Sequence, residues 1–453
     1  GSDNRDSAMR LWSPWRGNNV LQVIEYPSEQ AEARLADIAA RRMGADPALE
    51  KSVLEILETV RTGGDAALLD YSRRFDAPDF QAADLTVTDA EIDAAYEVID
   101  ADFLDILHAA IANVESFHRQ QLHPSHFTTH PDGTLLGQMV RPVAAAGLYI
   151  PGGKGGETPL ISSVLMNGIP ARIAGVKDVA LVTPPRKDGS VNPYLLVAAR
   201  EVGVSRIHKI GSAWAIAALT YGTESIGRVD VVVGPGNVFV ALAKKLVSGE
   251  VGIDMLAGPS EILVVADHAA NPDFIAADLL SQAEHDAMAS AVCITTDTGV
   301  GERVIESLQR QLLALPRHDI AEESLKRYGA IFHVATVEAA LGLANRIAPE
   351  HLELQVQDPW LCLGMIEHAG AVFLGDCTPE AVGDYFAGPN HVLPTAGTAR
   401  FASALGVESF IKRTSVLAYS RKAMERDAAS IIRLAELEGL TAHAASVRVR
   451  LKG

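Results

Sequence analysis

The N-terminal part of the chain places apolar and polar residues at the spacing of amphipathic helices. Apolar residues recur three and four positions apart over 29–44, 46–75 and 103–122, a period that predicts helices with one buried face. Asp89 stands where a further helix, with the segment EIDAAYEVID, would be capped. None of these segments carries a motif for chemistry, so we predict a helical N-terminal segment that serves packing and support.

From about residue 140 the pattern changes to short runs of Val, Ile and Leu that alternate with helical stretches. Such runs begin near residues 178, 206, 229, 261, 291, 329 and 371. Alternating strands and helices predict βαβ units with mostly parallel sheets. The length fits two halves that meet near residue 260 better than one very wide sheet. At the C-terminus we expect a helix followed by a short strand, VRVRL.

These elements predict an α/β protein with two Rossmann-like domains, a helical N-terminal segment and a small C-terminal module. The dinucleotide fingerprints are incomplete, because no strand is followed by GxGxxG. Ligands of open parallel sheets bind beyond the carboxyl ends of the strands, where we expect the Gly-rich turns at 234–237, 257–261 and 375–376. The expected boundaries are an N-terminal segment over 1–41, a first α/β domain over 42–148 with 260–404 that holds the metal and catalytic residues, a second α/β domain over 149–259 on the cofactor side, and a C-terminal module over 405–453.

Composition and charge exclude several classes of partner. The chain has 453 residues and a formal net charge of -18, so its surface would repel nucleic-acid phosphates and anionic lipids. No uncharged apolar run reaches the roughly 18 residues of a membrane span. The start lacks the apolar stretch of a signal peptide, and Gly1-Ser2 resembles a cleavage scar. The cysteines form no CxxC pair, and we expect buried thiols at Cys293, Cys362 and Cys377. We expect a cytoplasmic protein with no nucleic-acid and no membrane partner.

The segment SQAEHD at 281–286 offers a possible metal site. Its flanks predict a helix, so Gln282 and His285 would stand three residues apart on one face. An amide oxygen and an imidazole nitrogen at this spacing can reach one metal ion. A polar pair at this spacing is also common on a solvated helix face, and the spacing alone leaves both readings open.

The segment APEHLEL at 348–354 offers two proton carriers. Pro349 ends the preceding helix, which places Glu350 and His351 on a turn just before a short strand. Adjacent Glu and His of different basicity could deprotonate an alcohol and activate water. A surface turn without chemistry is the alternative.

Two further segments carry candidate functional residues. The Gly- and Pro-rich segment GDYFAGPNHVLPTAGTARF at 383–401 has little periodicity, which is typical of functional loops. Asp384 could be an oxygen ligand there, and His391 could contact substrate. The segment LEGLTAHAASV carries Glu438 and His443 in the terminal module.

The chain resembles the histidinol dehydrogenase family in several long motifs that occur in the family's order from about residue 140 to the C-terminus. They are GLYIPGG, SSVLMNGIPARIAGV, VDVVVGPGNVFVALAKKLV, IDMLAGPSEILVVAD, DLLSQAEHD, APEHLEL, GPNHVLPTAGTARF and GLTAH. The resemblance implies a homodimer in which the terminal module completes the partner's site. It also implies functional residues, position by position: the zinc ligands Gln282, His285, Asp384 and His443; the catalytic pair Glu350 and His351; the substrate contacts Ser260, His391 and Glu438 beside the zinc ligands and His351; and the cofactor positions Tyr149 and Asn237.

The resemblance implies a zinc-dependent oxidation of L-histidinol through L-histidinal to L-histidine with two NAD, the last steps of histidine biosynthesis. His351 would be the base for the alcohol, and Glu350 would activate water for the aldehyde. Trp214 departs from the family, which usually has Gln at this cofactor-contacting position, so the affinity for the cofactor or its identity could differ. Trp could stack on a flat ring.

Three alternatives remain open from the sequence. The nearest is a paralogous zinc- and NAD-dependent dehydrogenase of another small alcohol, such as a sulfonated diol. A second, from another class, is a zinc hydrolase or lyase that uses Glu350 as its base. The third is a catalytically silent binding protein, which the complete set of inferred ligands and proton carriers disfavours.

Overall fold

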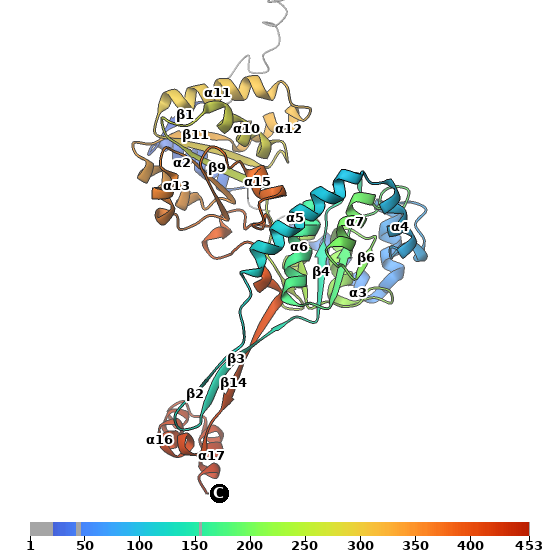
Figure 1. The fold of residues 1–453 in the computed structure, drawn as a ribbon, viewed down its shortest axis with the longest axis vertical. Coiled ribbons are helices and arrows are strands. Elements are labelled where there is room, and N and C mark those ends of the chain that lie inside the picture. Colours follow the sequence, from blue (N-terminus) through green and yellow to red (C-terminus); the bar gives the residue numbers. More distant parts are fainter. Residues whose placement is uncertain (1–20, 42–46, 154–155, 453) are drawn as a thin grey trace, which may run out of the picture.

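Two parallel β-sheets with helices on both faces organise the chain, and a thin arm extends from them (Figure 1). The computed structural model describes residues 21–41, 47–153 and 156–452, so Gly1-Ser2 and the expected helical residues 42–44 lie outside the described part. One sheet has the order β1-β11-β10-β9-β12-β13, and the other has the order β6-β5-β4-β7-β8. The predicted α/β fold with two Rossmann-like units is confirmed.

The six-stranded unit is built around a central β9 whose neighbours are β10 and β12. Helices α10, α11 and α12 cover one face, and α2 and α13 cover the other. Its strands are β1 (Val23–Glu25), β9 (Glu261–Ala266), β10 (Ser290–Thr295), β11 (Ala330–His333), β12 (His351–Gln355) and β13 (Ala371–Leu374), and its helices are α2 (Glu29–Ala39), α10 (Pro272–Ala283), α11 (Thr298–Leu312), α12 (His318–Tyr328), α13 (Val337–Ile347), α14 (Pro359–Cys362) and α15 (Glu380–Tyr385).

The five-stranded unit has the same layered design. Helices α4 to α7 cover one face, and α3, α8 and α9 cover the other. Its strands are β4 (Ala145–Tyr149), β5 (Asp178–Val182), β6 (Arg206–His208), β7 (Val231–Val233) and β8 (Gly252–Ile253), and its helices are α3 (Pro47–Phe75), α4 (Asp89–Val98), α5 (Ala101–Arg119), α6 (Ile161–Ala174), α7 (Pro193–Glu201), α8 (Ser212–Tyr221) and α9 (Val238–Val247).

The N-terminal elements divide between the units differently from the expected boundaries. Helices α3, α4 and α5 pack against α8, α7 and α6 of the five-stranded unit, whereas we expected 42–148 to join 260–404. Strand β1 and helix α2 belong to the six-stranded unit. The apolar stripe of a helix predicts that one face is buried, but does not identify the partner. The cap of α4 also differs, because Thr88 accepts the backbone N–H of Glu91 and Asp89 is already helical.

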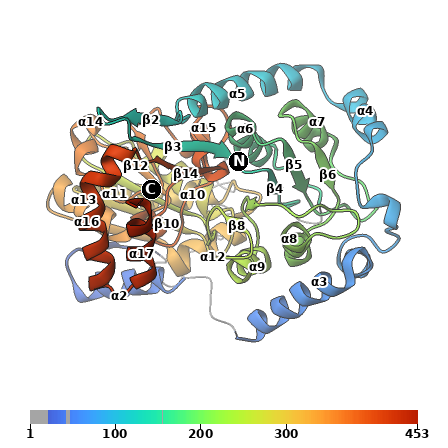
Figure 2. The same cartoon turned by 90° about the horizontal axis from the view of Figure 1, so that it is seen from below.

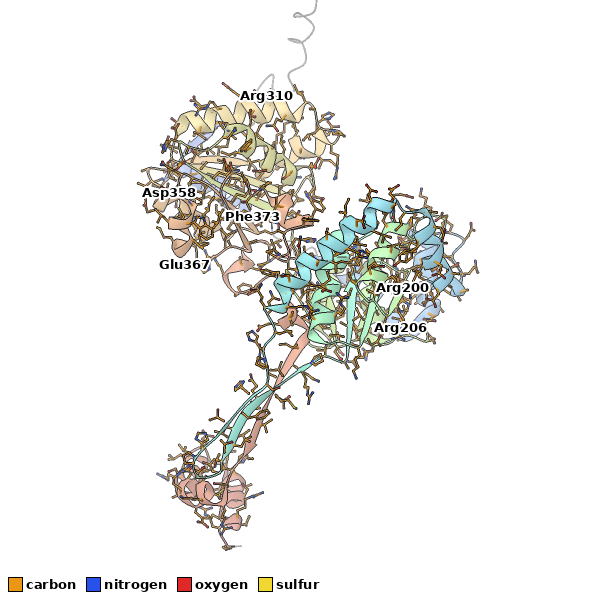
Figure 3. All side chains as sticks on the ribbon, in the orientation of Figure 1. Arg200, Arg206, Arg310, Asp358, Glu367 and Phe373 are labelled. Atoms are coloured by element: carbon orange, nitrogen blue, oxygen red, sulfur yellow. The ribbon has the colours of Figure 1, made fainter. Side chains whose placement is uncertain are left out.

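The arm is an antiparallel sheet that the sequence pattern did not predict. Its order is β14-β3-β2, and it ends in two helices at the far end from both units (Figure 1). Figure 2 views the molecule from below, so these two helices lie in front. The elements are β2 (His126–Thr129), β3 (Leu135–Pro142), β14 (Ile411–Ala418), α16 (Arg421–Leu437) and α17 (Thr441–Arg450). The expected VRVRL strand is wrong, because this segment forms the end of α17 and its last turn. Side chains of the arm project away from a narrow ribbon (Figure 3).

Two further findings bear on the expectations from composition. Among the described residues, no helix combines the length and apolar character required to cross a membrane. Cys293 and Cys362 are buried as expected, but Cys377 is exposed. Its position after β13, in the turn before α15, accounts for this difference.

Candidate active site

Glu350 and His351 lie at the amino end of β12, next to the start of β9. Helix α13 ends at Ile347, and His351 is the first residue of β12, where it pairs with Ile262. The helix break at Pro349 is therefore confirmed. Glu350 and His351 lie just before and at the start of the strand, as predicted. The turn 257–261 was expected at a carboxyl edge, and this expectation is wrong because the turn lies at the amino end of β9. The direction of parallel strands predicts that residues just before these strands share one edge of the sheet. It does not determine which edge of the sheet faces the five-stranded unit.

The ring of His351 has one nitrogen fixed and one free. Nδ1 donates its hydrogen to the carbonyl oxygen of Glu261 across 2.9 Å, which leaves Nε2 as a proton acceptor. Nε2 is buried and has no hydrogen-bond partner in the described chain. Burial lowers the pKa of His351 to about 4, and the charges of His391 and His285 act in the same direction. A neutral imidazole with a free Nε2 is suited to act as a general base.

Glu350 is a buried carboxyl group bound to the backbone of its neighbour strand. Its Oε2 accepts the N–H of Glu261 at 2.9 Å, and its own N–H donates to Oε2 of Glu261 at 3.3 Å. Burial raises the pKa of Glu350 well above its ordinary value, and the Glu261 charge raises it further. A carboxylate with a raised pKa is a stronger base than an exposed one and can activate water.

Gln282 and Asp384 approach His351 from two helices. Gln282 lies in the last turn of α10, with its amide nitrogen 3.2 Å from Nδ1 of His351. Its Oε1 is buried without a hydrogen-bond partner in the part of the chain described. An orphaned amide oxygen beside carboxyl and imidazole groups fits a metal ion. His285 lies beyond the end of α10, which stops at Ala283, so the expected helical pair is partly wrong.

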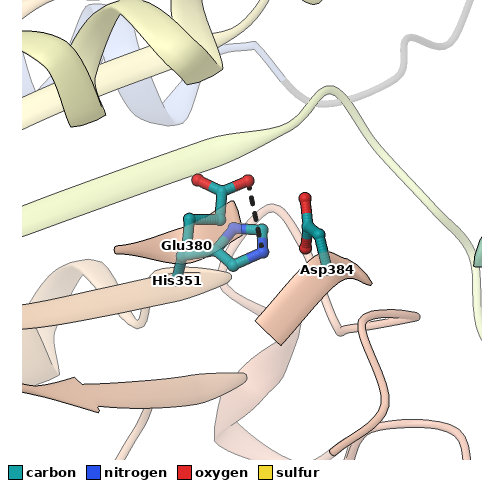
Figure 4. Close-up of side chains that lie close together, drawn as sticks. All are labelled: His351, Glu380 and Asp384. Atoms are coloured by element: carbon teal, nitrogen blue, oxygen red, sulfur yellow. Dashed lines mark ion pairs between the residues drawn. The ribbon is translucent and has the colours of Figure 1, made fainter. Parts of the chain in front are cut away.

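Glu380 is a site residue that the sequence analysis missed. Glu380 and Asp384 stand four residues apart on α15 and therefore share a helix face. His351, Glu380 and Asp384 each offer a ligand atom, and these atoms lie within 4.8 Å of one another (Figure 4). Burial raises the pKa of Asp384 to about 6. The spacing of two acids in TPEAVGDY was the signal that could have found this group.

A cavity of about 140 Å³ lies over these residues and is lined by His351, Phe373, Asp384 and His391 among others. His391 also contacts the backbone of Ser162 at the start of α6, and burial lowers its pKa to about 4. Ser260 directly precedes β9 and is partly exposed. The loop that carries His391 therefore joins the edge of the six-stranded sheet that carries His351 to the carboxyl side of β4 in the other unit.

Glu438 and His443 do not join the other candidates within one chain. Both are exposed, Glu438 at the end of α16 and His443 in α17. Figure 1 places these helices at the far end of the arm. A site that includes them would need a second copy of the chain.

Tyr149 and Asn237 lie at the carboxyl edge of the five-stranded sheet. The hydroxyl oxygen of Tyr149 accepts the N–H of Ser212 at 3.0 Å. Asn237 caps α9 by accepting the N–H groups of Phe239 and Val240. Such a turn into a helix N-terminus suits an anionic or nucleotide ligand. Both residues occupy the expected edge of the sheet. The structure shows no hydrogen bond between Tyr149 and Asn237.

The turn before Asn237 requires glycine. Gly234 has φ +110, and a Cβ there would lie 2.2 Å from the carbonyl oxygen of Tyr149. The backbone of the turn therefore packs directly against β4. This close approach requires a glycine at the first position of GPGN, although the segment lacks the GxGxxG motif.

The side chain of Trp214 is buried among residues of the five-stranded unit. Its ring stacks on those of Tyr71 and Phe75, with centroid distances of 5.3 and 5.6 Å. Only 5% of the residue is exposed. The ring that could have stacked on a cofactor thus packs α8 against the end of α3.

A neutral imidazole, a buried carboxyl group and a group of possible metal ligands lie together beside a unit with a Rossmann-like fold, an arrangement that is typical of dehydrogenases. The family model for histidinol dehydrogenase matches residues 39–451. The chain belongs to the histidinol dehydrogenase family, whose members are NAD-dependent oxidoreductases.

Individual proteins of this family are similar over almost the whole chain. The histidinol dehydrogenase of Desulfotalea psychrophila is 58% identical over 425 residues, covering 94% of this chain and 98% of that protein. That of Nitratidesulfovibrio vulgaris is 53% identical over 429 residues, covering 95% and 98%. The crystal structure of histidinol dehydrogenase from Elizabethkingia anophelis has a TM-score of 0.89 at 37% identity, covering 96% of this chain and 99% of that one.

Proposed function

We propose that this chain oxidises L-histidinol through L-histidinal to L-histidine, with Zn²⁺ in its site and two NAD as hydride acceptors. The observation that carries this proposal is the pair of adjacent bases at one strand end. His351 has a free Nε2 and a low pKa, whereas Glu350 has a high pKa. Two bases of different strength suit two successive oxidations of one bound carbon.

Gln282, His285 and Asp384 would hold the zinc ion together with His443 of the partner subunit. The orphaned Oε1 of Gln282 supports this assignment. Of the three groups in Figure 4, we assign only Asp384 to the ion, because His351 needs Nε2 for proton transfer. When bound, zinc supplies a Lewis-acidic centre that orients the amino and imidazole nitrogens of the substrate.

His351 serves the first oxidation. Its Nε2 removes the hydroxyl proton while the carbon transfers hydride to the first NAD, and the products are the aldehyde, NADH and a proton. The lowered pKa keeps the ring neutral at physiological pH, so the acceptor is available. His391 lines the cavity beside this base, and both His391 and Ser260, which directly precedes β9, would contact the substrate.

Glu350 serves the second oxidation. It removes a proton from water as the oxygen attacks the aldehyde carbon, which gives the hydrate. The hydrate then transfers hydride to a second NAD and becomes the carboxylate, with release of protons. The aldehyde stays in the buried site between the steps, where it is protected from side reactions. Tyr149 and Asn237 would contact the NAD at the edge of the five-stranded sheet.

A homodimer would complete each site. Glu438 and His443 would reach the partner's site through the arm, with Glu438 contacting substrate. Exposed apolar side chains at the end of the arm support this arrangement, since Leu434, Leu437 and Val449 are 60% exposed or more. Apolar groups of this size commonly mark a protein interface.

The test is NADH formation from L-histidinol before and after metal removal. We expect two NADH for each L-histidine, loss of activity with a chelator and recovery with Zn²⁺. Turnover of a sulfonated diol instead of L-histidinol would favour a paralogous dehydrogenase. Metal-dependent turnover of a substrate without NADH would favour a zinc hydrolase or lyase.

A further inference from the structure

Glu261 touches both catalytic residues although it lies outside the substrate cavity. Its N–H donates to Oε2 of Glu350, and its carbonyl oxygen accepts the Nδ1 hydrogen of His351, both at 2.9 Å. Its carboxylate also accepts the backbone N–H of Glu350 at 3.3 Å. The position of this one residue therefore determines the direction of the Glu350 carboxylate and the tautomer of His351.

The carboxylate of Glu261 is buried and is paired with Arg41. Nη2 of Arg41 lies 2.7 Å from Oε1 of Glu261, and the two side chains are 4% and 7% exposed. Arg41 is itself held in place, since Nη1 donates to the carbonyl of Met288 at 2.8 Å and Nε donates to that of Ile38 at 3.2 Å. Removal of either partner of such a pair leaves an uncompensated buried charge.

The same pair holds the loop that carries His391. Oε1 of Glu261 accepts the N–H of Ala396 at 2.8 Å. Nearby, the N–H of Gly258 donates to Oγ1 of Thr395 at 2.6 Å. Arg41 follows α2 of the six-stranded unit, and Glu261 begins β9 after the chain returns from the five-stranded unit. The ion pair thus connects the end of α2, the start of β9 and the loop that carries His391.

We propose that Arg41 is a positioning residue that acts through Glu261 to hold Glu350 and His351 in their working arrangement. This inference rests on the proposed function, because it assumes that these two residues are the bases of the two oxidations. Arg41 has no contact with the substrate cavity that the structure records. Its effect passes through the charge and the backbone of Glu261.

The charges around Glu350 give this role a specific signature. Glu261 and Asp384 raise the pKa of Glu350, and Arg41 lowers it. His351 lies 3.7 Å from its carboxylate and is neutral at physiological pH. Loss of the Arg41 charge should therefore raise the pKa of Glu350, whereas loss of the Glu261 charge should lower it.

The experiment compares Arg41→Met and Glu261→Gln in the zinc-loaded full-length enzyme. The readouts are kcat and KM for L-histidinol and the pH dependence of L-histidinal oxidation. For Arg41→Met we expect kcat to fall roughly 10- to 100-fold with KM within about twofold, and the rising limb of the pH profile to move to higher pH. For Glu261→Gln the limb should move to lower pH. The double variant should lie between them.

Arg310→Met is the matched control, because Arg310 forms an exposed pair with Asp273 on the outer helices. It should leave kcat and the pH limb unchanged. Arg41→Lys keeps the charge but not the planar fork, so it should lower kcat without moving the limb. If Arg41→Met does not fold, Glu261→Gln and Arg41→Lys carry the test.

The outcomes separate this inference from the proposed function. A wild-type enzyme that forms no NADH from L-histidinol contradicts the proposed function itself. If the wild type is active, two results contradict the role of Arg41. In one, the rising limb of the pH profile does not move in Glu261→Gln. In the other, this limb moves in the same direction in Arg41→Met and Glu261→Gln.

Discussion

Oε1 of Glu380 lies 3.6 Å from Nε2 of His351, which is the nitrogen left free by the bond to Glu261. Burial raises the pKa of Glu380 well above its ordinary value, with further contributions from Asp384 and Glu350. A proton that arrives on Nε2 places a positive charge beside this oxygen, and that charge favours the ionised carboxyl group. In the proposed mechanism, Glu380 would therefore stabilise the imidazolium that forms on His351 during alcohol oxidation.

Glu380→Gln should slow the oxidation of L-histidinol by roughly 10- to 100-fold, because the protonated His351 loses its nearest counter-charge. The measurement is kcat at saturating L-histidinol and NAD. Glu367→Gln is the matched control, since Glu367 is exposed on the same unit (Figure 3). Equal rates for Glu380→Gln and the control would exclude this role.

Mixed dimers test whether each site takes His443 from the partner. Asp384→Ala and His443→Ala should each lose zinc and activity as homodimers. In a hybrid of the two, one site keeps both ligands if His443 crosses between subunits. Random pairing should then restore about a quarter of the wild-type activity. No restoration in hybrids isolated with two different tags would mean that each chain uses its own His443.

Glu353 links stability to pH. Burial raises its pKa to about 9, and the Asp278 charge acts in the same direction. The folded protein therefore retains this proton between pH 4.5 and about 9, whereas the unfolded chain releases it, so stability falls as pH rises through this window. Glu353→Gln removes this pH-dependent loss of stability, because the glutamine side chain does not titrate. The substitution should therefore raise the melting temperature at pH 8 by roughly 2–4 °C. At pH 4.5 the two proteins should melt together.

Thermal melting of Glu323→Gln provides the control for that prediction. Glu323 is half exposed and pairs with Arg327 on α12. Its substitution should give no pH-dependent gain. A gain for Glu353→Gln that is the same at acid and alkaline pH would show that packing, and not the buried proton, causes it.

Trp214 should contribute to stability through its stack with Tyr71 and Phe75. Trp214→Ala removes a buried ring between α3 and α8 and should cost about 3–5 kcal/mol of the free energy of unfolding. Trp214→Phe keeps an aromatic ring and should cost less. Urea titration measures both. A loss below 1 kcal/mol for Trp214→Ala would contradict a packing role and return attention to the cofactor.

The local parts of the fold and site were predictable from sequence because their causes are local. Pro349 ends a helix through its own backbone, and the alternation of apolar runs reveals the parallel strands. Gly234 and Asn237 mark a turn into a helix for similar reasons. Chemistry-bearing segments such as 281–286 could be found in the same way.

The rest depends on contacts between residues far apart in sequence. Nothing in the neighbourhood of Arg41 reveals its pair with Glu261, which lies 220 positions away. The pairing of β3 with β14 joins segments that are similarly distant, and their exposed faces lack a clear alternation. The expected strand VRVRL is wrong because this segment continues α17, which packs on α16.

The division of work between His351 and Glu350 is the central claim, and single-turnover NADH formation from L-histidinol and from L-histidinal tests it most directly. His351→Asn should slow the alcohol step by roughly 10²–10⁴-fold and the aldehyde step far less. Glu350→Gln should show the reverse, because it retains the alcohol base and loses the base for water. Equal losses in both steps for each variant would contradict separate bases.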